Sequence, residues 1–581
     1  MCGIAGYYTS NKGFNGSNLL KSLEGSLYHR GPDQNGTYQN SQVGFVHTRL
    51  SIIDISNGRQ PFCADGVALI ANAEIYNYKE LIRNNSEYSY SSSSDCEVII
   101  PLYQKYGLKF SDHLRGMYSV ALYDENEDKL IISRDPFGIK PLYYIINESG
   151  FYFASEIKAL CEAEIIDKKI DNNVLKELLA HQYSLDSNTI ISGIKRVLPG
   201  ETIIIKKGKI EKKFLNNPLK KIGNKNKSDK GFLKKLDSAL YDSVSKHLRA
   251  DVPLGLFLSG GIDSTVLLII MSELLDKPVN SYTAYFDIAS NFERDHSSYL
   301  ASKYKSNHIE LKVDKDNFIN DLPRVIKALD DPVADYAVLP TFLLAERASK
   351  DLKVILCGEG GDELFAGYGR YRKILRPLLF NNNNLQKKSI FAKKGILRDK
   401  FLNPKNYNVL FENYSCLTKL QNAQLFDTKY WLPNDLLNKV DRCLMYHGLE
   451  GRTPYLDNII FENSFNLPDK LKIRQGRGKY ILRKWLSHKD KSAKAFQRKS
   501  GFTVPVVDWI FQEGEMLGPL VAQQECIKDI AYPSSVRSIF MKKTKKSSLA
   551  AWVLLFYSLW YKIHIIDKKT EGTIFDVLSN N

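Results

Sequence analysis

The chain opens with Met1, Cys2 and Gly3, and this position gives the cysteine two groups that can act together. An initiator methionine before a small residue is normally removed, which would leave Cys2 with a thiol and a free α-amino group. Such an amine has an ordinary pKa of about 7.7–8.0, so near neutral pH it can accept the thiol proton. Cys2 is therefore a candidate nucleophile with its own general base. Taken alone, a cysteine at this position more often simply begins a strand.

A glycine-rich turn at residues 259–264 is a second candidate for chemistry. Gly260 and Gly261 allow a tight turn, in which backbone N–H groups and a helix N-terminus point at one anion. Ser259 and Ser264 add hydroxyl donors, and Asp263 supplies a carboxylate for Mg²⁺. The turn lacks the spacing of a Walker A loop. It predicts a phosphate site of another kind, although a purely structural strand–helix turn can contain the same glycines.

A second turn of the same kind follows at residues 355–363 and weakens that structural alternative. Glu359 lies between glycines and Asp362 directly follows them, again after an apolar stretch. We expect Asp263 and Asp362 to end neighbouring strands, at the carboxyl edge where open parallel sheets bind ligands. Two carboxylates at that edge favour a metal-bridged nucleotide phosphate.

Two kinds of pattern must position these residues. Residues 1–212 contain short alternating strands (44–47, 67–70, 118–123 and 129–133) and helical segments (96–106 and Asn172–His181), which predict an α+β layered sandwich. Residues 213–230 turn polar and predict a linker. Residues 231–581 begin with strands (252–258, 279–286, 309–313 and 353–357) that alternate with helices (264–275, 340–350 and from 361). This alternation predicts a parallel doubly wound α/β domain, followed by a helical C-terminal part.

Composition limits the partners and the compartment. The 581 residues carry a net charge of +16, but the 81 Lys and Arg are spread along the chain, and the cluster at 220–227 resembles a solvated linker. We therefore expect anionic small substrates and no nucleic acid. The eight cysteines form no C-x-x-C pair and the N-terminus has no signal peptide pattern, which indicates reduced thiols in a cytoplasmic protein. The apolar segment 549–566 predicts a buried helix rather than a membrane span.

Taken together in order, these motifs resemble one family. The motifs are residues 30–33, 47–54, 72–77, 94–97, 134–143, the two glycine-rich turns, and residues 439–442, 452–457, 479–483 and 499–502. The first half resembles a class II glutamine amidotransferase domain with an N-terminal-nucleophile αββα sandwich. The second half resembles the ATP-pyrophosphatase synthetase domain to which the glutamine-hydrolysing asparagine synthetases fuse it.

This resemblance implies roles in the first half. Cys2 would be the thiolate that attacks glutamine, and Asn72 with the N–H of Ala73 would form the oxyanion hole. The glutamine-binding positions would be Arg49, Leu50, Ser51, Ile52, Ile53, Asn72, Ala73, Glu74 and Asp95. Among these, Arg49 would hold the α-carboxylate. The family usually has Gly where this chain has Ala73, which predicts strain and a weaker glutaminase if the position needs a positive φ.

The resemblance also implies roles in the second half. The ATP-binding positions would be Phe257, Ser259, Gly260, Gly261, Asp263, Ser264, Ala284, Cys357 and Gly358. Asp263 and Asp362 would bind Mg²⁺, Lys479 would neutralise the phosphates, and Glu359 would act when ammonia attacks an acyl-adenylate.

The implied reaction uses glutamine, MgATP and an acceptor carboxylate, with aspartate as the default acceptor, and ammonia passes between the domains through an internal tunnel. Amidation of another carboxylate, such as a uronic acid of a surface polysaccharide, remains an alternative, as does a binding protein with inactive loops. A β-lactam-forming relative is disfavoured because that branch does not use the Cys2 glutaminase. We assign no residue to the acceptor, although the stretch 330–337 and Arg370 or Arg372 are candidates, and a homodimer is left open.

Overall fold

A computed structural model describes residues 2–11, 13–216, 229–287, 292–375, 389–391, 395–402, 414–497 and 504–579. The basic cluster 220–227, most of the predicted linker and the motif 499–502 lie outside these residues. Among the described residues, no helix combines the length and the apolar character needed to cross a membrane.

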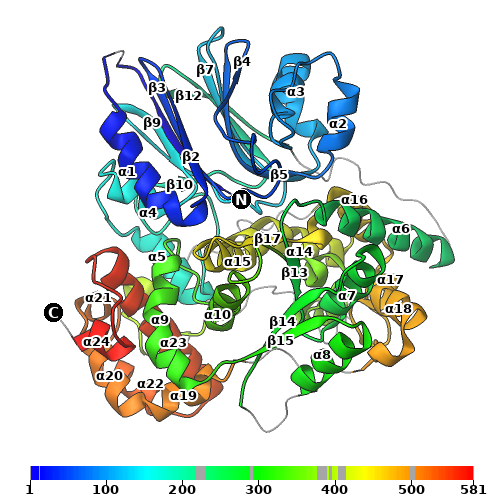
Figure 1. Ribbon diagram of the computed structural model, residues 1–581. Coiled ribbons are helices and arrows are strands. Elements are labelled where there is room, and N and C mark those ends of the chain that lie inside the picture. Colours follow the sequence, from blue (N-terminus) through cyan, green and yellow to red (C-terminus); the bar gives the residue numbers. More distant parts are fainter. Residues whose placement is uncertain are drawn as a thin grey trace.

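The first half contains two six-stranded antiparallel sheets stacked face to face (Figure 1). One sheet has the order β10 (Lys195–Arg196), β8 (Tyr143–Asn147), β9 (Gly150–Ala154), β1 (Cys2–Thr9), β3 (Val43–Arg49) and β2 (Gln34–Gln39). The other has the order β12 (Lys209–Leu215), β11 (Glu201–Lys206), β7 (Lys129–Arg134), β6 (Gly116–Asp124), β5 (Val67–Ile75) and β4 (Phe62–Ala64). Helices α1 (Ser17–Leu27) and α4 (Ile157–Glu162) cover one outer face, and α2 (Tyr78–Asn84) and α3 (Ile99–Tyr106) cover the other. The αββα sandwich expected from the sequence is confirmed.

Alternation along the inner strands decides which residues face the layer between the two sheets. Ile4 on β1 and Ile70 on β5 belong to the core between the sheets, whereas Ala5 and Ala73 pack toward the outer helices. Because successive side chains of a strand point to opposite faces, Cys2, Asn72 and Glu74 share the inner side with Ile4 and Ile70. The candidate nucleophile therefore lies at one end of the layer between the sheets.

The second half is built on a five-stranded sheet in which every pair is parallel. Its order is β15 (Asn307–Lys312), β14 (Asn280–Tyr285), β13 (Leu254–Phe257), β16 (Val354–Leu356) and β17 (Glu450–Arg452). The chain fills the sheet outward from β13 on one side and from β16 on the other, so the topological switch point lies between these two strands. The doubly wound sheet and the adjacency of the strands before the two glycine-rich turns are confirmed.

Helices surround this sheet and form the C-terminal part. They are α6 (Asp229–His247), α7 (Ile262–Leu274), α8 (Phe292–Lys303), α9 (Lys315–Ala328), α10 (Val338–Ala348), α11 (Gly361–Leu364), α12 (Gly369–Ile374), α14 (Lys419–Phe426), α15 (Asn438–Met445), α16 (Asn458–Phe465), α17 (Asp469–Lys472), α18 (Tyr480–Lys489), α19 (Val506–Gln512), α20 (Gly514–Gln523), α21 (Glu525–Lys528), α22 (Pro533–Phe540), α23 (Lys545–His564) and α24 (Ile574–Ser579). The apolar segment forms α23, in which Trp552 and Trp560 are fully buried and donate hydrogen bonds to carbonyl oxygens at 2.7 and 2.9 Å.

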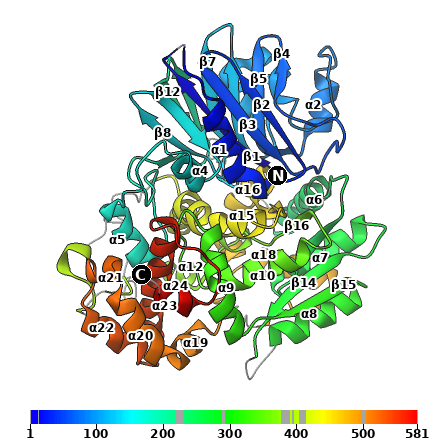
Figure 2. The same ribbon diagram turned by 60° about the vertical axis from the view of Figure 1, so that its left-hand side comes forward.

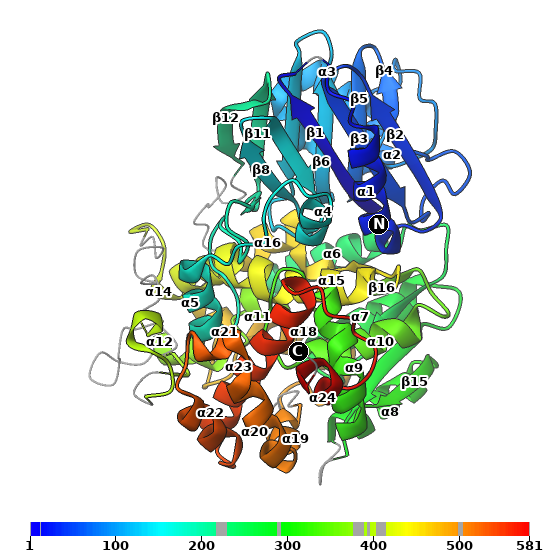
Figure 3. The same ribbon diagram turned by 90° about the vertical axis from the view of Figure 1, so that its left-hand side faces the viewer.

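One helix of the first half lies among the helices of the second. Helix α5 (Asn172–His181) has the bounds expected from the sequence, and two further views place it beside α21, away from both antiparallel sheets (Figures 2 and 3). Gln182, at its C-terminal end, accepts a hydrogen bond from the N–H of Ala334 at 2.7 Å and donates one from its side chain to the Ala334 carbonyl at 2.6 Å. The two halves are thus held together by packing as well as by the chain that joins them.

Candidate active sites

Cys2 lies at the start of β1, directly opposite Arg49 at the end of β3. The backbone N–H of Cys2 donates to Oδ1 of Asn72 at 3.1 Å, and the N–H of Leu50 donates to the thiol. The residue is 6% exposed, and burial raises the pKa of its thiol above the ordinary value. A buried thiol with that pKa needs a nearby base to become a nucleophile.

Asn72 has the geometry expected of an oxyanion-hole donor. Its side chain is fully buried, and Nδ2 has no hydrogen-bond partner among the residues that the structure describes. An unpaired buried donor costs free energy, and such groups are found where a ligand completes the hydrogen bond. The adjacent Ala73 is part of β5, opposite Tyr118 on β6, and is not one of the residues with positive φ. The condition for backbone strain at Ala73 is therefore not met.

The guanidinium of Arg49 is held by the loop that follows β3. It donates to the carbonyl oxygens of Ile53 and Asp54 at 3.0 and 2.7 Å and to Oε1 of Gln34 at 2.6 Å. In the part of the chain that the structure describes, no carboxylate forms an ion pair with it. An oriented buried cation without a counter-ion suits a substrate carboxylate.

The next residues of this loop, Leu50, Ser51, Ile52 and Ile53, are buried and continue to the boundary with the second half. Ser51 donates its N–H to Asp33 at 2.7 Å, and the Ile52 carbonyl accepts from the N–H of Asp251 at 2.9 Å.

Two buried carboxylates complete this first group of residues. Asp95 accepts a hydrogen bond from the N–H of Ile75 at 2.7 Å, and burial raises its pKa to about 6. Glu74 forms an ion pair with Arg452 at 2.9 Å, and burial raises its pKa well above the ordinary value despite that arginine. Arg452 belongs to β17, so a strand of the second half reaches the first site.

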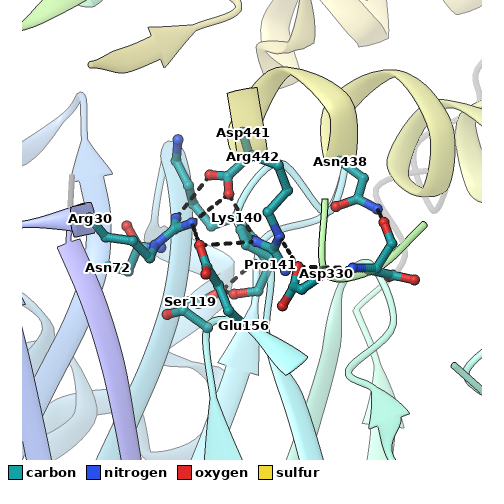
Figure 4. A network of polar contacts seen from close by, with 12 residues as sticks. Arg30, Asn72, Ser119, Lys140, Pro141, Glu156, Asp330, Asn438, Asp441 and Arg442 are labelled. Carbon is teal, nitrogen blue, oxygen red and sulfur yellow. Dashed lines mark hydrogen bonds and ion pairs between the residues drawn. The ribbon is translucent and has the colours of Figure 1, made fainter. Parts of the chain in front are cut away.

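A second buried ion network joins the halves beside Cys2 (Figure 4). Nε of Arg30 donates to the Cys2 carbonyl at 3.2 Å, and Nη1 donates to Glu156 at 2.7 Å. The same guanidinium binds both oxygens of Asp441, at 2.8 and 3.1 Å. The network extends to Arg442, Asp330 and Asn438. Because Arg30 is fully buried, its charge depends on these partners for compensation.

The glycine-rich turn after β13 leads into α7. Gly260 has a φ of +66°, and Gly261 is the N-cap of the helix. Ser259 and Ser264 lie with their hydroxyls 3.2 Å apart, and the N–H of Gly261 donates to the Ser259 hydroxyl at 3.3 Å. The turn therefore presents hydroxyls and a helix N-terminus at the carboxyl edge of the sheet, as expected.

The turn after β16 meets the first one at Asp263. A Cβ atom on Gly361 would lie 2.6 Å from Oδ1 of Asp263, so only glycine allows this approach. Lys479, the N-cap of α18, pairs with Asp263 and lies 2.7 Å from Asp362. The three charged residues predicted at the phosphate site thus come together around one ammonium group.

Glu359 lies between these turns and an ion pair of the second half. Burial raises its pKa, Lys439 lowers it, and Asp263 raises it further. Lys439 pairs with Asp335 at 2.7 Å, which brings the predicted stretch 330–337 toward Glu359. Phe257 and Ala284 lie toward the carboxyl ends of β13 and β14, and Cys357 and Gly358 directly follow β16. These positions border the same edge of the sheet.

Arg370 has a different environment from the one suggested as an acceptor site. Its guanidinium lies 3.8 Å from the centre of the Trp431 ring and forms an ion pair with Asp427 at 2.9 Å. Arg372 is exposed. Arg370 is therefore already engaged by a carboxylate and an aromatic ring.

Comparisons with known proteins match both halves. Residues 1–215 match the model of a glutamine amidotransferase domain, and residues 235–562 match the asparagine synthase model. Asparagine synthetase (glutamine-hydrolyzing) 1 of Bacillus subtilis is 31% identical, over 97% of this chain and 97% of that protein. A putative asparagine synthetase (glutamine-hydrolyzing) of Mycobacterium bovis is 30% identical over the same shares. Amidase chry2 of Gibberella zeae is 28% identical over 83% of this chain and 86% of its own.

An N-terminal-nucleophile sandwich joined to a parallel sheet with two phosphate-type turns defines a glutamine-dependent carbon–nitrogen ligase. Within that class, the chain belongs to the asparagine synthase family.

Three further residues of the sites, Arg30, Asp441 and Arg452, have no role that could be predicted from the sequence, in which they appear only within longer motifs. Each lies in a charged motif (30–33, 439–442 and 452–457), and each is buried at the junction of the halves. A charged residue inside such a motif indicates that it has a buried partner. The sequence does not identify that partner, because it lies far away along the chain.

Proposed function

We propose that the protein is a glutamine-dependent asparagine synthetase. Glutamine hydrolysis at Cys2 would give glutamate and ammonia. At the parallel sheet, aspartate would attack ATP to form an aspartyl-adenylate and release pyrophosphate, and ammonia would then displace AMP to give asparagine. The observation that carries the proposal is the unpaired amide donor of Asn72 beside the buried thiol of Cys2, in a chain whose second half brings Asp263, Asp362 and Lys479 together.

In the first half, Cys2 without Met1 would attack the side-chain amide of glutamine, with its own α-amine as base. Asn72 Nδ2 and the Ala73 N–H would bind the developing oxyanion. Arg49 would hold the α-carboxylate, while Asp95 and Glu74 would bind the α-amino and amide ends. Ammonia would then pass inside the protein toward the second half, which the buried network around Arg30 joins to the first half beside Cys2.

In the second half, the turn from Ser259 to Ser264 would bind the phosphates, and Phe257, Ala284, Cys357 and Gly358 would line the nucleotide pocket. Glu359 would act on the acyl-adenylate as ammonia attacks. Its raised pKa and partial burial support a role in proton transfer. Adenylation is required because a carboxylate oxygen is a poor leaving group.

The residues present fit a magnesium ion. Oδ1 of Asp263 is buried and accepts no hydrogen bond from the residues that the structure describes, and Asp362 converges on the same point. Mg²⁺ is commonly bound by one or two carboxylates together with substrate phosphates and water. Asp263 and Asp362 would hold the ion, which would neutralise charge on the phosphates.

The decisive experiment combines the Cys2→Ala variant with two nitrogen donors. With aspartate and MgATP, the variant should form asparagine and pyrophosphate from ammonium chloride but not from glutamine, because only the first centre is lost. Glutamine hydrolysis that persists in the variant would remove Cys2 from the proposal. Loss of ammonia-dependent synthesis in a folded variant would contradict the separation of the two centres.

A second candidate acceptor is another carboxylate, such as a sugar uronic acid. The observation that favours it is the similarity to Amidase chry2, a relative whose name specifies no amino-acid acceptor. Pyrophosphate release in the presence of aspartate, with asparagine detected by chromatography, supports the first candidate. Release with a nucleotide-linked or lipid-linked uronate but not with aspartate would replace it.

A further inference from the structure

Arg452 occupies a fully buried position on β17, at the edge of the parallel sheet. Its Nε donates to Glu450 at 2.5 Å, and its Nη1 donates to two carbonyl oxygens, those of His247 and Arg249, at 2.8 and 2.7 Å. These contacts fix the guanidinium plane from within the second half. The remaining nitrogen, Nη2, lies 2.9 Å from the carboxylate of Glu74 in the first half.

Glu74 lies close to the nucleophile, so a shift of its side chain would disturb the residues that contact Cys2. It follows Asn72 by two positions on β5, so the two side chains lie on the same face of the strand. Asn72 Oδ1 accepts the hydrogen bond of the Cys2 N–H. The Glu74 carboxylate therefore lines the same pocket as the nucleophile.

A carboxylate at this depth needs a cation to remain charged. Glu74 is buried, and isolated buried carboxylates take up a proton rather than stay ionised. Among the described residues, Arg452 is the cation that forms an ion pair with Glu74. An arginine held on three sides also restricts where that carboxylate can point.

The same residue borders the second centre through its main chain. The carbonyl oxygen of Arg452 accepts the N–H of Cys357 at 2.8 Å, directly after β16. One residue of the second half thus connects the candidate nucleotide edge to the candidate glutamine pocket.

We infer that Arg452 is a positioning residue of the glutamine site, supplied by the synthetase half, which orients the carboxylate of Glu74 for glutamine. This inference rests on the proposed function, in which Glu74 binds glutamine. It means that the glutamine site is not completed by the amidotransferase half alone.

Arg452→Lys tests the inference, because it keeps the charge but cannot reproduce all of the guanidinium contacts. We expect the KM for glutamine to rise about 10-fold, which corresponds to weakening the ion pair with Glu74 by about 1.4 kcal/mol. The kcat for glutamine hydrolysis and ammonia-dependent synthesis should stay within about twofold of wild type.

The matched control is Arg115→Lys. Arg115 also crosses between the halves, with ion pairs to Asp457 at 2.7 Å and Asp242 at 2.6 Å, but it has no ion pair with Glu74. A residue that only holds the halves together would behave as Arg115 does. The KM for glutamine of Arg115→Lys should therefore equal that of wild type, and an equal rise in both variants would overturn the inference.

A double-variant cycle separates this inference from the assignment of Glu74. Glu74→Gln should itself raise the KM for glutamine, and adding Arg452→Gln to it should cause no further rise. Glu450→Gln is added to every variant of the cycle, because Arg452→Gln would otherwise leave that buried carboxylate without its partner. The cycle then applies even if Arg452→Lys does not fold. An additive effect would overturn the inference, whereas an unchanged KM in Glu74→Gln alone would instead contradict the proposed role of Glu74.

Discussion

Around Cys2, single residues are arranged for a ligand rather than for stability. Asn72 keeps a buried donor without a partner, and Arg49 is oriented by main-chain carbonyls. Both arrangements cost free energy in the absence of a ligand. They are therefore the places where single substitutions should separate binding and catalysis from folding.

Asn72→Ala should lower the kcat of glutamine hydrolysis by about 10²–10³, the usual loss for one oxyanion donor. The substitution removes the unpaired Nδ2 but also the hydrogen bond that Oδ1 accepts from the Cys2 N–H, so the free energy of unfolding should fall by only about 1 kcal/mol. Steady-state glutaminase assays beside ammonia-dependent synthesis would check this. Equal losses in both assays would mean that the substitution damages the whole protein.

The pKa of Asp95, at about 6, predicts how glutamine use depends on pH. As pH falls through 6, Asp95 takes up a proton and loses the charge that would hold the substrate. The kcat/KM for glutamine should then fall about tenfold per pH unit. Because the folded state binds this proton more tightly than the unfolded chain, protonation of Asp95 favours folding. Its stabilising contribution is complete below the ordinary pKa of about 3.9 and is lost as pH rises through 6.

The measurement is a pH profile of kcat/KM with glutamine between pH 5 and 8, repeated for Asp95→Asn. The variant should bind glutamine poorly and lack the acidic limb. A limb that persists unchanged in Asp95→Asn would show that another group titrates there.

Among the elements, the turns at the carboxyl edge depend on close approach of backbone to charged side chains. A Cβ atom on Gly367 would lie 1.8 Å from Oδ1 of Asp362 and 2.3 Å from Cε of Lys479. Neither atom can move far, because each takes part in the same ion pair. Any side chain at position 367 would therefore displace the ion pair between Asp362 and Lys479.

Gly367→Ala should sharply reduce ATP-dependent pyrophosphate release while glutamine hydrolysis persists. Gly25→Ala is the matched control, since a Cβ there would meet nothing within 4 Å and Gly25 lies in α1. That control should keep full activity and stabilise the protein by about 0.5–1 kcal/mol. Pyrophosphate release and thermal melting of both variants would test the contrast.

The two glycine-rich turns could be predicted from sequence because each strand, turn and helix start is encoded within a short stretch. Strand β17 could not: it has three residues, two of them charged, and no apolar run. Glu450 and Arg452 are buried there because they neutralise each other and Glu74, which is a distant partner. Likewise, the sequence suggested strain at Ala73, but its position in a regular strand is set by pairing with β6.

Over the whole molecule, the halves are joined by buried charges rather than by an apolar contact alone. Arg30 and Asp441 are both buried and form a bidentate pair across the junction. By contrast, Lys353 and Asp33 also cross it at 2.6 Å, but their side chains are 37% and 28% exposed. Solvent screening makes such an exposed pair weak.

Asp441→Asn should destabilise the protein by about 3 kcal/mol, because it leaves the buried charge of Arg30 partly uncompensated. Glutamine hydrolysis should fall as well, since Arg30 binds the Cys2 carbonyl. Lys353→Met, the matched exposed pair, should change stability by less than about 1 kcal/mol. Chemical denaturation of the two variants measures both values, and equal effects would show that burial does not decide the strength of these pairs.

The separation of Arg30 from Asp441 also has a consequence in time. The two residues are 411 positions apart, so at about 5–20 residues per second a ribosome needs roughly 20–80 s to make the second after the first. Until then, Arg30, which binds the Cys2 carbonyl, lacks the carboxylate of Asp441 that neutralises its charge. Chains arrested before residue 441 should therefore release no ammonia from glutamine. Synthesis order thus delays the first activity until more than half of the part that consumes its product has been made.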